Sequence, residues 1–150
     1  MKRPLDLFAL GGLLFAIVVI LIFTTIPTKE QRVLRAARSG NENRLLELIS
    51  SGVSPDVRTP LGQTPLIIAT EQGYSKLVDR LLASGANVDA QDSNGWTALM
   101  FATRRNDTGL VGRLVAAGAS VSLTNDEGRT ALDIANGNRV LDVLIKKAPQ

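Results

Sequence analysis

The chain divides into one uninterrupted apolar stretch and a longer part in which apolar and polar positions alternate. No charged residue occurs between positions 7 and 26, and fourteen of these twenty residues are Leu, Ile, Val or Phe. As a helix, a stretch of this length rises about 30 Å, which matches the hydrocarbon core of a bilayer. Inserting these large apolar side chains gains on the order of 4–8 kcal/mol. The pattern predicts an N-terminal transmembrane helix in an anchor of residues 1–28, ended by Pro27.

A cleaved signal peptide is the main alternative to an anchor, because Lys2 and Arg3 precede the apolar stretch. The stretch is longer than the roughly 7–15 residues of a typical signal-peptide core, and no small-x-small cleavage site comes after it. A buried helix of a soluble protein would need a polar side, and this stretch has none. We therefore expect an uncleaved signal-anchor in a single-pass membrane protein.

The charges on the two flanks of the apolar stretch nearly balance. Lys2 and Arg3 precede it, and four basic residues lie at positions 29–38. Counted alone, these charges lean slightly towards a cytoplasmic domain. A short basic tail before a signal-like segment, however, is typical of proteins that export the domain on its C-terminal side. We expect the domain on the exported side (periplasmic or extracytoplasmic), with a cytoplasmic domain as the alternative.

Beyond the anchor, the same residues return at a spacing of 33 positions. Six columns share this spacing, which is the sequence signature of a repeat architecture. The columns are Gly62, Gly95 and Gly128; Thr64, Thr97 and Thr130; Leu66, Leu99 and Leu132; Ala36, Ala69, Ala102 and Ala135; Leu48, Leu81 and Leu114; and Gly52, Gly85 and Gly118.

Each repeat unit carries the signals of two short helices. In the second unit, Thr64 before Pro65 is typical of an N-cap followed by proline at the first helical position. The apolar positions at 77–82 form a stripe with helical spacing. Gly73 separates the two helices, and Gly85 is expected to end the second in the left-handed conformation. Helices this short are not stable alone, so each must bury its stripe against a neighbouring unit.

The repeated stretches resemble the ankyrin repeat, whose motif is Thr-Pro-Leu-His-x-Ala followed by Leu-Leu-x-x-Gly-Ala. Gly-Gln-Thr-Pro-Leu-Ile-Ile-Ala (62–69), Gly-Trp-Thr-Ala-Leu-Met-Phe-Ala (95–102) and Gly-Arg-Thr-Ala-Leu-Asp-Ile-Ala (128–135) match its first part. Leu-Leu-Ala-Ser-Gly-Ala-Asn-Val (81–88) and Leu-Val-Ala-Ala-Gly-Ala-Ser-Val (114–121) match its second part. The resemblance implies an all-α solenoid of about four helix-turn-helix units with hairpin loops between them.

The resemblance covers about residues 31–147 and places the repeat domain at 29–150. The expected units are about 29–58, 59–91, 92–124 and 125–150. The first unit lacks the Gly and Thr columns and the last is about three residues short, as is typical of capping repeats. The histidine of the family motif is replaced by Ile67, Met100 and Asp133.

Composition narrows the chemistry that the domain can perform. The chain has 150 residues and a net charge of +3, and it contains neither Cys nor His. These absences exclude a disulfide framework, a Ser-His-Asp triad, a Cys nucleophile and a His/Cys metal site. No Gly-rich phosphate loop and no long basic run occur. We expect no enzyme activity, cofactor, metal, small-molecule substrate or nucleic-acid partner.

The family resemblance implies a protein-binding surface along the hairpin tips and the adjacent face of the first helices. Tip positions and positions on the first helices of the last three units are the candidates. They are Leu61, Gln63, Glu71 and Gln72 in the second unit, Ser93, Asn94, Trp96, Arg104 and Arg105 in the third, and Asp126, Glu127 and Arg129 in the fourth.

Trp96 is the most informative candidate, because it is the only tryptophan and lies beside a turn glycine. Gln63 and Arg129 occupy the equivalent positions, so this column tolerates polar residues and is expected to be exposed. With Arg104, Arg105 and Arg129 beside it, Trp96 resembles an interface hot spot. The alternative is that Trp96 packs over a neighbouring hairpin and stabilises it, and that the two arginines are a solvated helix end.

Three functions remain open. The first is a membrane-tethered adaptor or scaffold that binds another protein. The second is an inhibitor or protective, immunity-like partner of an exported enzyme, which tight binding to one enzyme would distinguish. The third is an accessory subunit of an enzyme. Absence of His and Cys argues against an enzyme that acts alone.

Overall fold

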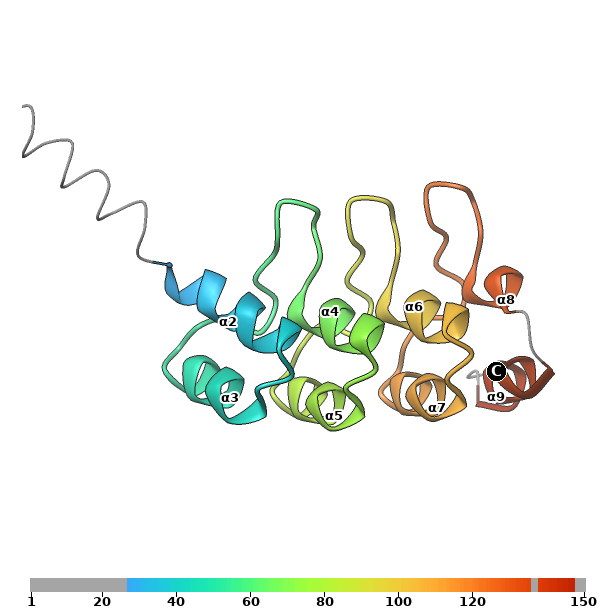
Figure 1. Ribbon diagram of the computed structural model, residues 1–150. Helices are drawn as coiled ribbons and strands as arrows, with labels where there is room; N and C mark the ends of the chain where they lie inside the picture. The colour runs from blue at the N-terminus through green and yellow to red at the C-terminus, as the bar shows by residue number, and fades with distance from the viewer. Residues whose placement is uncertain (1–26, 136–137, 148–150) are drawn as a thin grey trace, which may run out of the picture.

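The computed structural model describes residues 27–135 and 138–147, in which helices form two parallel rows below a row of hairpins (Figure 1). The inner row, next to the hairpins, contains α2 (Lys29–Arg38), α4 (Pro65–Gln72), α6 (Ala98–Arg104) and α8 (Ala131–Ile134). The outer row contains α3 (Glu42–Ser50), α5 (Ser75–Ala83), α7 (Thr108–Ala116) and α9 (Asn138–Lys147). Each inner helix and the outer helix after it make one repeat unit.

The inner helices begin where the sequence predicts. The side chains of Thr64, Thr97 and Thr130 each accept a hydrogen bond from the backbone N–H three residues later, as N-caps do. Pro65 occupies the first turn of α4, and Gly73 ends that helix with φ +83°. A side chain at such a φ would be strained, so glycine fixes the point where the chain turns back into the outer row.

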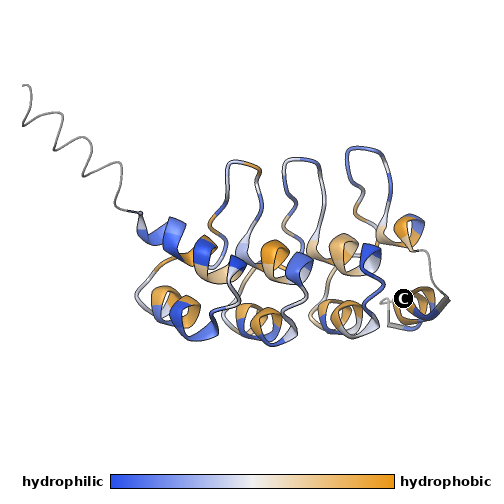
Figure 2. Cartoon of the chain, viewed as in Figure 1, coloured by the Kyte–Doolittle hydropathy of each residue, from blue (hydrophilic) through white to orange (hydrophobic). Residues whose placement is uncertain are grey.

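One continuous apolar core runs between the two rows of helices. The leucine columns at 48, 81 and 114 and the valines Val78 and Val111 are buried in it. Ala69 and Ala102 are fully buried between the inner helices, where a small side chain permits close approach. Ile67 and Met100, at two of the positions that differ from the family motif, also lie in this core. Figure 2 shows the complementary pattern, with hydrophilic residues along the hairpins.

Consecutive hairpins are joined into a ladder by backbone hydrogen bonds. Ser93 N–H donates to the carbonyl of Leu61 over 3.0 Å, and Asp126 N–H donates to the carbonyl of Asn94 over 3.0 Å. Side chains strengthen the ladder, because the Gln91 amide donates to the carbonyl of Thr124, 33 positions further along, at 2.9 Å. Only an isolated bridge occurs in the described part, so the predicted all-α repeat architecture is confirmed there.

The end of the stack differs from its middle. Helix α8 has four residues, half the length of α4. In the repeated leucine column, Leu66 and Leu99 are 0% and 1% exposed, whereas Leu132 is 38% exposed, because no further unit covers it among the described residues. Asp133, at the third departure from the family motif, is exposed and accepts hydrogen bonds from Thr130 N–H and Oγ1–H.

The predicted membrane span at 7–26 lies outside the described residues. Among those that the structure describes, no helix has the length and apolar character needed to cross a bilayer. The anchor of residues 1–28 and the boundary at residue 29 stay predictions.

Candidate protein-binding surface

The tip of each hairpin is shaped by one polar side chain that accepts hydrogen bonds from the backbone ahead of it. In the third unit, a carboxylate oxygen of Asp92 accepts from the N–H groups of Asn94 and Trp96, both at 2.9 Å. In the next hairpin, the side-chain oxygen of Asn125 likewise accepts from two backbone N–H groups. In the previous hairpin, the hydroxyl of Thr59 accepts from one, that of Gln63. These side chains fix the direction in which the residue after the turn glycine points.

Held in this way, Trp96 packs against the inner helix of its own unit. Its ring centroid lies 5.1 Å from that of Phe101, with the planes tilted by 50°. The guanidinium carbon of Arg104 lies 4.8 Å from the centroid of each ring. An aromatic pair contributes about 0.5–1.5 kcal/mol beyond burial, and an exposed cation–π contact contributes about 0.5–1 kcal/mol. Trp96 is therefore half-buried against its own inner helix.

A hollow of about 210 Å³ brings half of the predicted surface residues together. It lies between the hairpin tips and inner helices of the second and third units. Its walls are Leu61, Gln63, Glu71, Asn94, Trp96 and Arg104, together with Asp92 and Phe101. We call it the aromatic hollow.

Polar contacts organise the rim of the aromatic hollow. The Gln63 amide donates to the Glu71 carboxylate over 3.4 Å, and Arg104 lies 3.8 Å from the same carboxylate. Leu61 projects from its hairpin with 66% of its surface exposed. The hollow therefore offers an exposed apolar side chain and an aromatic ring beside donors and acceptors.

The other six predicted residues do not line the aromatic hollow. Gln72 is exposed on α4, and Ser93 contributes its backbone to the hairpin ladder. Arg105 has a structural contact, because its guanidinium donates to the carbonyl of Glu71 over 2.8 Å. The last three, on the exposed tip of the final hairpin, are Asp126, Glu127 and Arg129, of which the latter two form an ion pair.

Sequence reasoning missed a second hollow on the same face, one unit nearer the N-terminus. It measures about 360 Å³ and is lined by Gln31, Leu34, Arg35, Arg38, Thr59 and Pro60. We call it the basic hollow. The spacing of 33 held the signal for it, since Arg38 precedes Glu71 by 33 positions and Glu71 precedes Arg104 by 33. The first unit was overlooked because it lacks the repeated Gly and Thr residues.

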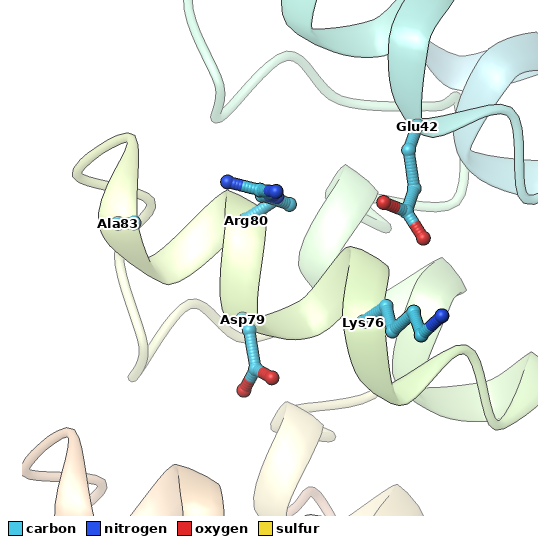
Figure 3. Close-up of a pocket in the computed structure, with 5 residues that line it drawn as sticks. All are labelled: Glu42, Lys76, Asp79, Arg80 and Ala83. Carbon is cyan, nitrogen blue, oxygen red and sulfur yellow. The ribbon is translucent and has the colours of Figure 1, made fainter.

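A third hollow lies on the outer row, away from the hairpins. It measures about 330 Å³ and is lined by Glu42, Lys76, Asp79, Arg80 and Ala83. In Figure 3, Glu42 extends from α3 towards α5, whereas Asp79 extends away from Glu42. Asp79 forms an ion pair with an arginine of the next unit. Charges of both signs alternate here without an aromatic or large apolar side chain, so this hollow favours no particular ligand.

Metal-ligating side chains in the described part are limited to carboxylates, since the chain has neither His nor Cys. No group of three or more Asp or Glu residues in the described part is placed to hold a metal ion. The pKa of Asp133 is lowered, first by the hydrogen bond from the Thr130 hydroxyl and then by that from the Thr130 backbone N–H. This carboxylate caps α8 and lies outside the three hollows.

Comparisons with known proteins identify the repeat. The family model for ankyrin repeats (3 copies) matches residues 33–125 and 72–150. Among solved structures, the chain is similar to the ankyrin repeat domain of Bcl-3, described as a unique member of the IkappaB protein family. The two share 35% sequence identity with a TM-score of 0.73 over 75% of this chain. The match spans 50% of the length of that domain chain. No curated protein sequence matches significantly.

Proposed function

This chain belongs to the ankyrin repeat family, and from that premise we propose that it is a membrane-tethered protein-binding module acting as an adaptor or scaffold. Ankyrin repeats generally mediate protein–protein interaction. The partner is another protein, held along the hairpin tips and the inner helices. We propose that the module binds without performing catalysis, because it lacks His and Cys.

The aromatic hollow is the observation that carries this proposal. Interface hot spots are enriched in Trp and Arg and lie in pockets from which partner binding excludes water. Trp96 and Arg104 line the aromatic hollow together, and Leu61 is an exposed side chain on its wall. Residues of two units contribute to the hollow, so the folded stack is needed to form it.

The tether is proposed from the sequence of residues 7–26. An anchor restricts the module to the layer next to the bilayer and raises its effective concentration for partners in the same membrane. We propose that residues 29–150 face the exported side. Protease digestion of intact spheroplasts addresses this directly, since protection of the domain would contradict export.

Capture of crosslinked neighbours by the full-length chain in its own membrane tests the binding role. Replacing two hot-spot residues is expected to cost at least about 2 kcal/mol, which weakens capture roughly 30-fold. Trp96→Ala with Arg104→Ala should therefore lose the captured partner. The double variant also loses the contacts with Phe101, so its unfolding must be recorded in parallel.

The matched control is Trp96→Phe with Arg104→Lys, which keeps an aromatic ring at position 96 and a positive charge at position 104. It should retain most of the capture. Equal capture by the wild type and the double alanine variant, with both still folded, would refute the assignment of the aromatic hollow as the binding surface.

A further inference from the structure

The net positive charge of the repeat domain is concentrated in its first helix. Helix α2 contains Lys29, Arg32, Arg35 and Arg38 against the single acidic residue Glu30. From residue 39 to the end, eleven basic residues stand against twelve acidic ones. In Figure 2 the start of α2 is hydrophilic, in keeping with these charges. One end of the stack is therefore basic and the rest nearly neutral.

Two of these basic residues meet in the basic hollow. Arg35 and Arg38 are exposed and line it together with Gln31 of the same helix. Neither arginine forms an ion pair with any described residue, whereas Arg104 and Arg113 each do. A guanidinium presents a planar fork of donors that matches a carboxylate. The hollow thus holds two such forks with no acidic residue among its lining side chains.

The basic hollow and the aromatic hollow lie on the same face in consecutive positions of the repeat. The first lies between α2 and the hairpin after it, and the second lies between α4, α6 and the tips above them. Packed helices lie about 8–10 Å apart. An extended peptide covers about 3.3 Å per residue. A bound segment would therefore need about three residues to pass from one hollow to the next.

We infer that the partner segment is an extended acidic peptide, in which an Asp or Glu carboxylate binds Arg35 and Arg38. An apolar side chain about three residues away occupies the aromatic hollow beside Trp96. This inference rests on the proposed function and adds the chemistry of the partner. Hydrogen bonds between charged groups are the strong ones, and the two guanidinium groups give the segment its register.

An anionic lipid surface is the other ligand whose charge complements these arginines. The peptide fits better, because the arginines line a hollow whose other wall includes Thr59 and Pro60 of a hairpin. A flat layer of headgroups would contact the outside of α2 rather than fill this space. A peptide requires the hollow and a lipid layer requires only the outside of α2, so one set of variants distinguishes the two ligands.

Selection from a random peptide library displayed on phage tests the inference with the full-length chain in nanodiscs of zwitterionic lipid. Wild-type binders should be enriched in Asp and Glu at a fixed offset from an apolar residue. Arg35→Gln with Arg38→Gln should remove the acidic enrichment and weaken the selected peptides about tenfold, a loss of about 1.4 kcal/mol. Arg80→Gln with Arg139→Gln removes the same charge elsewhere and should change neither result.

The outcomes separate the inference from the function on which it rests. Peptides that require Trp96 and Arg104 but show no acidic enrichment would overturn the inference and leave the binding function standing. Absence of any peptide that requires Trp96 and Arg104 would overturn both.

A lipid arm completes the experiment. The chain has no cysteine, so Ser39→Cys supplies one site for a fluorescent label at the end of α2. Quenching of this label by brominated phosphatidylglycerol should not depend on Arg35 and Arg38. Quenching that does depend on them, with an unchanged peptide selection, would overturn the inference in favour of lipid binding.

Discussion

Gly95 and Gly128 occupy equivalent places in consecutive hairpins, yet the structure predicts different costs for replacing them. Their φ angles are +74° and +71°, so alanine at either position suffers similar backbone strain. A Cβ atom on Gly95 would lie 2.9 Å from the Cα of Asn125 and 3.0 Å from the backbone N of Asp126. A Cβ atom on Gly128 meets no described atom within 4 Å, because the described part of the chain has no further hairpin beside it.

The difference between the two variants can be worked out from these contacts. Left-handed backbone costs an alanine about 1–2 kcal/mol, and the lower entropy of the unfolded chain returns about 0.4–1 kcal/mol. Both terms apply equally to Gly95→Ala and Gly128→Ala and cancel in the comparison. Overpacking against backbone adds about 1–3 kcal/mol for Gly95→Ala. Displacing Asp126 also weakens its hydrogen bond to Asn94, worth about 1 kcal/mol.

Gly95→Ala should therefore be less stable than Gly128→Ala by about 2–4 kcal/mol, since the clash and the weakened hydrogen bond add. Urea unfolding of both full-length variants in detergent micelles measures this difference, followed by circular dichroism and by the fluorescence of Trp96. The slope against urea should match that of the wild type. Equal destabilisation of the two variants would refute the reasoning, because it would show that the contact between hairpins carries no weight.

Two further predictions concern single polar side chains. Asp92→Ala removes the acceptor of two backbone hydrogen bonds at a half-buried tip and should lower the free energy of unfolding by about 2 kcal/mol. Asp92→Asn should be nearly neutral, because Asn125 accepts the equivalent bonds in the next hairpin. Thermal unfolding checks both variants, and equal losses of stability would contradict the explanation. The pKa of Asp133 is lowered in the folded chain by Thr130, so its contribution is complete above the unfolded pKa and is lost as pH falls through the folded value. The stability advantage of the wild type over Asp133→Ala should hold at neutral pH and shrink below about pH 4, and urea midpoints that keep a constant gap down to the acid limit would contradict it.

Much of the helical architecture was predictable because its signals are local. Thr64 and Pro65 start a helix through atoms within one turn, and Gly73 ends it through its own φ. The spacing of 33 then implies that equivalent residues of successive units are neighbours. The shortened last unit was also visible in the spacing, and α8 is accordingly short.

The binding surface was predictable only as a region. Arg104 and Arg105 look alike in the sequence, but Arg104 lies over the two aromatic rings and Arg105 donates to the backbone of the previous unit. The expectation that Trp96 was either exposed or packed over a neighbouring hairpin missed its contact with Phe101. Which side chain meets which depends on rotamers and on the rise between units, and neither is encoded in the spacing.

The repeat, its helix starts and its turns follow from the sequence alone, as does the apolar segment from which the anchor is proposed. These features depend on interactions between residues close in the sequence, or on a spacing that does not depend on how the side chains pack. The folded stack was needed to show that Arg35 and Arg38 share a hollow. It was also needed to show that Gly95 faces the next hairpin, whereas Gly128 faces no hairpin of the described part. Both depend on surfaces contributed by two units at once, and such surfaces exist only when the stack is folded.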